Sequence, residues 1–400
     1  MSDICIIGGG HAAGRLVNNL QKLNYNGNID IFSEENFLPY ERPPLSKDFL
    51  LDEKNINDFQ IDINLDKVNY YFNTKINKVD FQNKLIIDLN NKSYSYSKLI
   101  FANGSYPKRI FDEDIKGVHY LRNINDSINI KKNIQNSKNI ILLGAGYISL
   151  EISSSIKKKY PKKEVTIIDI SEKILVRNSN DDLRELILKH QRKNNVKFLL
   201  KSKIKSVQKN NDESIKFIVL DDDKLLACDL LIVGIGVHPN NKIIEGTVLY
   251  DENGIKVNEF CETSIKDVYA LGDVALAKNV FLNKFVREES WNNAEKQSNI
   301  LAQNLIGTKI AYEEIPWFWT DQFDQNFQIL GEINNFDNKI LRSYSDNKNT
   351  FLYIKNKKLI GAIAENNGRD ISIIRKILKK NIEPNFEKIQ NININLKELL

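Results

Sequence analysis

Two stretches of the chain share one pattern of apolar and polar positions. In the first, Ile4, Ile6 and Ile7 form a short apolar run, a glycine-rich turn follows, and apolar residues then recur at helical spacing. The second repeats the order strand, turn, helix and strand over 140–168. The spacing from the first glycine of the turn to the returning strand is the same in both. We therefore expect two dinucleotide-binding folds of the α/β class.

Three further apolar runs end in a turn signal. They lie at 98–102, at 229–236 and at 268–273, and the last of them has to return to one of the two predicted sheets. In a parallel sheet the carboxyl ends of the strands form the ligand crevice. From about Pro316 the pattern becomes strand-like alternation, with helical spacing after Asp370, which predicts a separate α+β C-terminal domain.

Length and composition exclude several classes of protein. A chain of 400 residues exceeds one ordinary hydrophobic core, so two or three domains are expected. No apolar run reaches membrane-spanning length and the start does not resemble a signal peptide, so we expect a cytoplasmic protein without membrane association. The formal net charge of +5 is too small and dispersed to indicate nucleic-acid binding. Cys5, Cys228 and Cys261 are isolated, which indicates buried structural thiols and no metal site.

The first glycine-rich turn carries the G-x-G-x-x-G/A pattern between a strand and a helix. Gly8 permits the tight turn, Gly10 lets the backbone approach a diphosphate, and Ala13 keeps helix and strand close. The diphosphate is then expected at the helix N-terminus. Glu34 and Glu35, which follow the second strand, are candidates for holding the ribose hydroxyls, with surface carboxylates as the alternative.

The second turn has Gly144 and Gly146, but Ser149 stands at the third position, where glycine is usual. Asp169 ends the second strand where the ribose-binding acid belongs, and no arginine follows directly, so NAD is favoured over NADP. Two dinucleotides in one chain imply an exchange between them. One must be a bound redox cofactor, because two soluble nicotinamides would only exchange hydride with each other.

The stretch "PYERPPLSK" at 39–47 interrupts the first fold with two consecutive prolines. Proline fixes its own backbone and disfavours helix in the preceding residue. We therefore expect Tyr40 to Arg42 to be extended or in a turn, and a helix to begin near Ser46.

With these residues in place, the chain resembles the FAD-dependent pyridine nucleotide oxidoreductases, and among them the ferredoxin reductases. The resemblance runs from residue 4 to about 335 in the family's order. It rests on "GGGHAAG", "PYERPPLSK", "YLRNIND", "GAGYISLE", "VGIGVHPN", "YALGD", "ESWNNAEKQ" and "PWFWTDQFDQNFQILG". Asn103, where the family has threonine, and Ser149 depart from the pattern.

The resemblance implies a discontinuous FAD-binding domain at 1–110 and 237–315, an NAD-binding domain at 111–236 and a C-terminal domain at 316–400. It implies catalytic roles for Lys47 paired with Glu151 and for Trp319, which would lie near the flavin and the partner's docking surface. A buried lysine-glutamate pair near flavin N5 would offer positive charge where reduced flavin becomes anionic. The expected cofactor-binding residues are Gly8, Gly10, Ala13, Glu34, Glu35, Arg42, Lys47, Arg122, Asp273 and Trp291 for FAD, and Gly144, Gly146, Tyr147, Ile148, Asp169 and Gly236 for NAD.

The activity implied by the resemblance is NADH-dependent ferredoxin reduction. Hydride would pass from NADH to FAD N5, and single electrons would pass to a small acidic [2Fe-2S] ferredoxin or rubredoxin serving an oxygenase or P450. The lack of a cysteine pair favours this over relatives that use a disulfide. The alternatives are another NADH flavoenzyme, such as an oxidase, nitrite reductase subunit or monodehydroascorbate reductase, or a flavoprotein similar to apoptosis-inducing factor. Monomer and homodimer remain alternatives.

Overall fold

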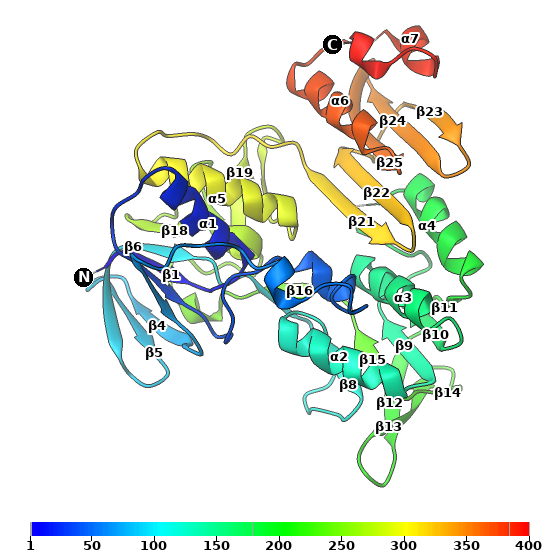
Figure 1. The fold of residues 1–400 in the computed structure, drawn as a ribbon, viewed down its shortest axis with the longest axis horizontal. Coiled ribbons are helices and arrows are strands. Elements are labelled where there is room, and N and C mark those ends of the chain that lie inside the picture. Colours follow the sequence, from blue (N-terminus) through cyan, green and yellow to red (C-terminus); the bar gives the residue numbers. More distant parts are fainter. Residues whose placement is uncertain (1, 178, 384, 400) are drawn as a thin grey trace. The chain divides into compact units, whose positions relative to one another are not determined.

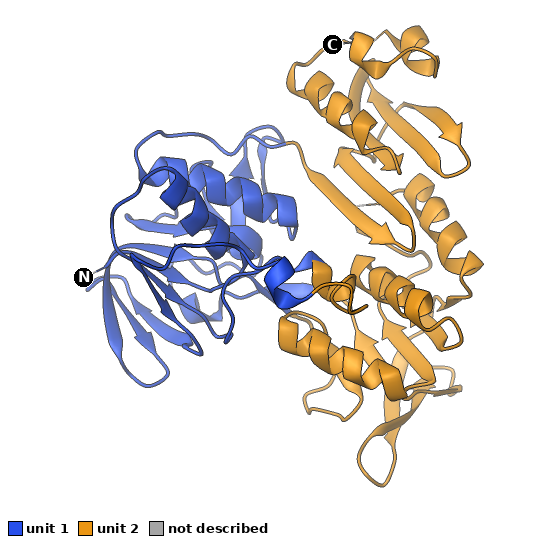
Figure 2. Cartoon of the chain, viewed as in Figure 1, with its two compact units in different colours: residues 1–43, 55–106, 237–314 blue, residues 44–54, 107–236, 315–400 orange. Residues whose placement is uncertain are grey.

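The computed structural model describes residues 2–177, 179–383 and 385–399. The chain divides into two compact units, coloured separately in Figure 2. The first comprises 1–43, 55–106 and 237–314, and the second comprises 44–54, 107–236 and 315–400. The sequence-based domain boundaries remain a prediction, but one feature of this division bears on the site. The segment "PYERPPLSK" is split between Pro43 and Pro44, so Arg42 belongs to the first unit and Lys47 to the second.

The first unit is built on a seven-stranded sheet in the order β3-β2-β1-β6-β5-β4, with β18 pairing parallel to β6. Strand β18 lies in the run predicted at 268–273, so the expectation that this run returns to one of the two sheets is confirmed, and the sheet is the first. The strands β1 to β3 and β6 are parallel, as expected for a dinucleotide-binding fold. The bounds are β1 (Ser2–Ile7), β2 (Ile29–Phe32), β3 (Val68–Tyr71), β4 (Ile76–Asp80), β5 (Leu85–Asp88), β6 (Ser93–Phe101) and β18 (Val268–Ala270).

Two helices of the first unit pack against each other, α1 (His11–Lys22) and α5 (Trp291–Leu305) (Figure 1). The apolar face of α1 is the one predicted from helical spacing, and Ala13, Leu16, Val17 and Leu20 are fully buried with residues of α5. Smaller elements complete the unit. They are η2 (Ile56–Asp58), β7 (Ser105–Pro107), β16 (Val237–Pro239), η3 (Lys242–Ile244), β17 (Ile255–Val257), η4 (Gly272–Val274), β19 (Ala275–Asn279) and β20 (Lys284–Val286).

The second unit contains a five-stranded parallel sheet in the order β11-β10-β9-β15-β8. Its central strands are apolar along their length, as expected for strands covered on both faces. Its strands and helices are β8 (Val118–Tyr120), α2 (Ile124–Asn136), β9 (Asn139–Leu143), α3 (Tyr147–Lys159), β10 (Glu164–Ile168), α4 (Asp181–Lys193), β11 (Lys197–Leu199) and β15 (Leu230–Val233). An antiparallel sheet lies between β11 and β15 in the sequence, formed by β12 (Ile204–Lys209), β13 (Ile215–Leu220) and β14 (Leu225–Ala227).

The C-terminal part of the second unit is an antiparallel sheet in the order β21-β22-β25-β24-β23 with helix α6 packed on it. The predicted α+β character of this part is confirmed. The bounds are β21 (Trp317–Gln322), β22 (Gln325–Gly331), β23 (Asn338–Ser345), β24 (Lys348–Lys355), β25 (Lys358–Glu365), α6 (Gly368–Lys379), α7 (Phe386–Gln390) and η5 (Leu396–Leu399). Among the helices of the described residues, none has the length and hydropathy needed to span a bilayer.

The double proline corrects one prediction. No α-helix begins near Ser46; instead a 3₁₀-helix, η1 (Pro43–Ser46), contains the prolines themselves, and hydrogen-bonded turns follow. Proline has a backbone angle suited to a first helical turn and lacks the N–H that such a turn leaves unpaired. The carbonyl of Pro44 then accepts from the backbone N–H groups of Lys47 and Phe49. The expectation that Tyr40 to Arg42 would be non-helical is confirmed.

Candidate cofactor and active site

Helices α1 and α3 begin with neither a side-chain cap nor an acidic residue in the first turn, whereas α6, which also lacks a side-chain cap, has Asp370 there. The N-cap residues of α1 and α3 are Gly10 and Gly146. In contrast, α2, α4 and α5 are capped by Asn123, Asn180 and Ser290. The first amides of a helix need an acceptor, and an uncapped N-terminus is suited to an anion. The two glycine-rich turns are therefore positioned to bind diphosphates.

Glycine is required in both turns for conformational and steric reasons. Gly8 has φ of +108° and Gly144 has φ of +96°. A Cβ on Gly8 would lie within 2.5 Å of the carbonyl oxygen of Ala102, and a Cβ on Gly144 would lie within 2.5 Å of that of Gly234. Gly146 differs, because its Cβ position faces almost open space. This opening is the shape expected where a diphosphate approaches the backbone.

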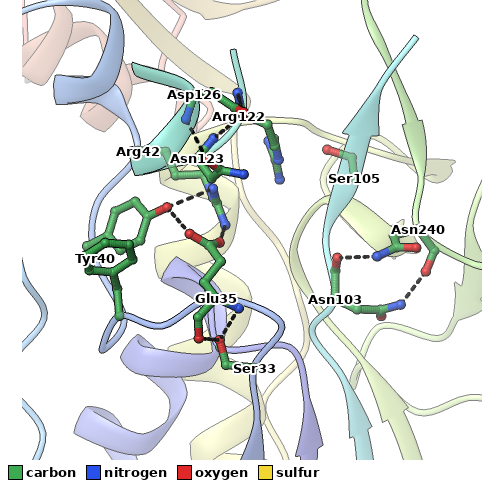
Figure 3. Close-up of polar contacts among 12 residues, drawn as sticks. Ser33, Glu35, Tyr40, Arg42, Asn103, Ser105, Arg122, Asn123, Asp126 and Asn240 are labelled. Carbon is green, nitrogen blue, oxygen red and sulfur yellow. Dashed lines mark hydrogen bonds and ion pairs between the residues drawn. The ribbon is translucent and has the colours of Figure 1, made fainter. Parts of the chain in front are cut away.

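A charged cluster lies against the first turn (Figure 3). The guanidinium of Arg42 donates to Glu35 at 2.8 Å, and the hydroxyl of Tyr40 donates to the same carboxylate. A Cβ on Gly10 would be only 3.3 Å from Nη2 of Arg42. The predicted residues Gly10, Glu35 and Arg42 are thus brought together. Glu34 is not part of this cluster, since it is half exposed and paired with Lys75.

Asp273 and Trp291 lie near the same helix N-terminus. Asp273 accepts a hydrogen bond from Ser105 at 2.7 Å, and Gly272 approaches the side chain of Ala12 in α1. The indole of Trp291 packs edge-on against His11, the first residue of α1. The first unit therefore gathers its predicted cofactor residues, except Glu34, around the N-terminus of α1.

Asn103, where the family pattern has threonine, forms a reciprocal pair with Asn240 (Figure 3). Its Nδ2 donates to the carbonyl of Asn240, and Nδ2 of Asn240 donates to the carbonyl of Asn103 at 3.3 Å. The Oδ1 atom of Asn103 is buried and has no hydrogen-bond partner among the described residues. A buried acceptor without a donor is costly, so this end of β6 fits a ligand that carries a hydrogen-bond donor.

In the second turn Ser149 stands where glycine is usual, and Gly234 on a neighbouring segment leaves room for its side chain. A Cβ on Gly234 would lie 2.7 Å from Oγ of Ser149, so the serine fits because residue 234 has no side chain. Asp169 accepts from the backbone N–H of Ala145 at 2.6 Å and of Ser171 at 2.7 Å. The carboxylate of Asp169, which directly follows β10, therefore holds the glycine-rich turn in place.

The other predicted NAD residues lie at the carboxyl ends of strands or in the first turn of α3. Tyr147 is partly buried and its ring lies 4.6 Å from that of Phe318, whereas Ile148 is 45% exposed. Gly236 follows β15 with φ of +100°. Arg122 precedes α2, and its backbone N–H donates to Asp126 at 2.9 Å (Figure 3).

The predicted pair of Lys47 and Glu151 forms within the second unit, with Nζ and Oε1 3.2 Å apart. Glu151 is buried in α3 and Lys47 is mostly buried. Burial alone lowers the pKa of Lys47, but the charges of Glu151 and Asp321 outweigh it and raise the pKa above its usual value. The lysine therefore stays protonated at neutral pH. The indole of Trp319 lies beside it, with Nζ 5.6 Å from the ring centroid.

Sequence reasoning missed the polar side chains that complete this pair. The hydroxyls of Ser46 and Thr320 donate to Glu151 at 2.6 and 2.7 Å, and Asp321 accepts from Lys47 at 3.1 Å. A second layer consists of Gln322, which donates to Thr320, and Gln191, which donates to Gln322. One signal was available: Thr320 and Gln322 are polar at alternate positions of a strand that starts with aromatic residues, which is unusual unless inward polar groups are paired.

Comparison with known proteins agrees with this geometry. The family model "Pyridine nucleotide-disulphide oxidoreductase" matches residues 2–298, and the model "Reductase C-terminal" matches 317–400. The chain belongs to the pyridine nucleotide-disulphide oxidoreductase family. It is therefore an oxidoreductase with a reductase-type C-terminal domain, and this family uses FAD and NAD(H). The uncapped N-termini of α1 and α3 and the orphan acceptor of Asn103 fit such cofactors.

Individual members of the family match almost the whole chain. A rubredoxin-NAD(+) reductase of Pseudomonas putida is 31% identical, over 84% of this chain and 89% of that protein. The ferredoxin–NAD(+) reductase component of 3-phenylpropionate/cinnamic acid dioxygenase from Photorhabdus laumondii is 28% identical, over 93% and 95%. The structure of a ferredoxin reductase for the CYP199A2 system from Rhodopseudomonas palustris is 27% identical, with a TM-score of 0.93 over 100% of this chain and 99% of that one.

Proposed function

We propose that this protein is an NADH-dependent ferredoxin reductase. It would take hydride from NADH and deliver single electrons to a small acidic [2Fe-2S] ferredoxin or to rubredoxin, which in turn would serve an oxygenase or P450. The observation that carries the proposal is the buried pair of Lys47 and Glu151 beside Trp319. Relatives that match almost all of the chain are named as ferredoxin or rubredoxin reductases, which supports it.

The proposed cofactor assignment follows the uncapped N-termini of helices α1 and α3. FAD would be held in the first unit by the turn at Gly8 and Gly10, with Arg42 and Asp273 beside it, and NAD in the second unit by Gly144 and Gly146. When bound, FAD accepts a hydride from NADH and releases the two electrons one at a time. The proposal includes the domain boundaries, with an FAD-binding domain at 1–110 and 237–315, an NAD-binding domain at 111–236 and a C-terminal domain at 316–400. It also includes a cytoplasmic location.

The role of the chain's own residues is to hold charge in place. Lys47 is fixed by two carboxylates and stays protonated, so it would supply positive charge without having to transfer a proton. Fixed charge of this kind lowers the free energy of a transition state in which negative charge develops. The three cysteines are buried, isolated and free, so electrons would not leave through a thiol pair.

The direct test is reduction of a ferredoxin or rubredoxin by the purified holoprotein with NADH. We expect acceptor reduction to exceed NADH oxidation by oxygen alone by at least tenfold. Rapid oxidation of NADH by oxygen without stimulation by any ferredoxin or rubredoxin would refute the proposal and favour an oxidase. Slow reduction by NADH, with a long-lived charge-transfer absorbance, would favour a flavoprotein similar to apoptosis-inducing factor.

A variant tests the part played by the lysine. Lys47→Ala should retain FAD, measured by absorbance, while its flavin is reduced by NADH at least tenfold more slowly in stopped-flow experiments. Lys54→Ala is the matched control, because Lys54 lies in the same segment but is paired with Asp48 at the surface. Equal reduction rates in both variants would remove Lys47 from the mechanism.

A further inference from the structure

The C-terminal strand β21 supplies a side chain to the lysine site that none of the sequence motifs assigned. Oδ2 of Asp321 accepts from Nζ of Lys47 and from Nε1 of Trp319, each at 3.1 Å. Oδ1 of the same carboxylate accepts from Nδ2 of Asn326 at 2.7 Å. One carboxylate therefore contacts two of the residues expected to act on the flavin.

We propose that Asp321 is a positioning residue, which holds the ammonium of Lys47 between two carboxylates and fixes the orientation of the Trp319 indole. This inference rests on the proposed function. It assigns to the C-terminal sheet a part in reduction by NADH, in addition to any part in binding the electron acceptor.

The geometry requires a carboxylate at this position rather than an amide. Three donors surround Asp321, from Lys47, Trp319 and Asn326. An asparagine offers one acceptor oxygen, so its NH₂ group would face a donor whichever way the amide is turned. Asn326 cannot simply turn its own amide to compensate, because its Oδ1 already accepts from Gln328 at 2.9 Å.

The second carboxylate of the site cannot replace Asp321. Glu151 is engaged elsewhere, since Ser46 donates to Oε2 and Thr320 donates to Oε1, the atom that already faces Lys47. Thr320 is itself held by Gln322. Loss of the Asp321 charge would leave Lys47 with Glu151, a partner that it shares with Thr320, and with the ring of Trp319, whose indole N–H would lose its own bond to Asp321.

The test measures the reactivity of Lys47 directly and needs neither NADH nor an acceptor. The folded holoprotein is labelled with a limiting amount of an amine-acylating reagent at pH 8, and modification of Lys47 is followed by peptide mass spectrometry. The side chain of Asp321 is 44% exposed, so water screens part of its charge, and removing that charge is expected to lower the pKa of Lys47 only modestly. In Asp321→Asn, labelling of Lys47 should therefore rise about three- to tenfold.

Two variants and one internal reference control the experiment. Asp324→Asn removes the same charge from the same hairpin, where Asp324 is 87% exposed and faces Lys158, and should leave Lys47 labelling unchanged. Asp321→Glu keeps the charge and should remain within about twofold of the parent protein. Lys157, buried and bonded to two carbonyls, reports loss of packing in the second unit.

Equal labelling of Lys47 in the parent protein, Asp321→Asn and Asp324→Asn would overturn the inference. A parallel rise at Lys157, or an equal rise in Asp321→Glu, would also overturn it, because packing rather than charge would be responsible. Stopped-flow reduction adds a kinetic readout: Asp321→Asn should slow hydride transfer severalfold at saturating NADH with little change in the NADH concentration for half-saturation. Absence of ferredoxin reduction by the parent protein would refute the proposed function but leave the labelling result standing.

Discussion

Replacing Glu151 by glutamine keeps the shape of a buried side chain and removes its charge. The carboxylate faces three donors, the hydroxyls of Ser46 and Thr320 and the ammonium of Lys47. The two hydroxyls can rotate to accept from the new NH₂ group, whereas an ammonium can only donate. Hydrogen bonds to a charged group contribute about 1.5–3 kcal/mol each and neutral ones about 1 kcal/mol, so we expect a loss of about 3 kcal/mol.

The expected loss can be measured by calorimetry of the holoprotein. The second unit has roughly 230 residues, for which 1 kcal/mol corresponds to about 2–4 °C, so its Tm should fall by about 6–12 °C. Glu185→Gln, at an exposed position of α4, is the matched control and should change stability by less than about 0.5 kcal/mol.

A double-mutant cycle identifies the cause of the loss. Lys47→Met with Glu151→Gln should cost about 1–2 kcal/mol less than the sum of the single changes, because in the double variant no buried ammonium faces the new amide and no buried carboxylate at position 151 is left without the ammonium. If Tm falls by less than about 2 °C and the two single changes are additive, Lys47 and Glu151 do not form the ion pair in solution. This result would refute the reasoning.

Three further predictions concern the second glycine-rich turn, the cysteines and the pH dependence of the Lys47 contribution. Gly146→Ala should fold normally and keep FAD, since its Cβ meets only open space, but should raise the KM for NADH at least tenfold by filling the diphosphate position. Burial raises the pKa of Cys5, Cys228 and Cys261 to about 12, so Ellman's reagent at pH 7.5 should find no reactive thiol until guanidinium is added; prompt reaction would contradict their burial. The stabilisation from Lys47, whose pKa is raised, should be complete below its usual pKa of 10.5 and disappear as the pH rises through the folded-state value. The urea midpoints of the parent protein and Lys47→Met should therefore stay apart up to pH 10.5 and converge only at higher pH.

The features that the sequence predicted well are those with local causes. Gly8 and Gly144 are needed for a backbone angle that other residues rarely adopt, and this need is visible in a few consecutive letters. The apolar spacing of α1 likewise follows from burial of one face. Both turns, their helices and the return of β18 to one of the two sheets were therefore within reach of pattern analysis.

The features that were missed depend on contacts between distant parts of the chain. Ser149 departs from the family pattern, yet its hydroxyl fits because Gly234 leaves room on another strand. Asp321 could not be assigned from spacing, since it meets Lys47 only after the C-terminal sheet has packed on α3. The 3₁₀-helix at Pro43 to Ser46 was also missed, because proline restricts its predecessor but is itself compatible with a first helical turn.

The Lys47 site is assembled from three separate stretches of sequence, and this limits how its parts can be exchanged between relatives. A chimera that takes residues from Pro316 onward from another reductase would replace Thr320 and Asp321 along with the rest of the C-terminal sheet. Any change in its rate of reduction by NADH could then be mistaken for an effect of the acceptor-binding surface. Placing the junction after Gln322 would keep the native side chains around Lys47 and Glu151, and would separate the two effects.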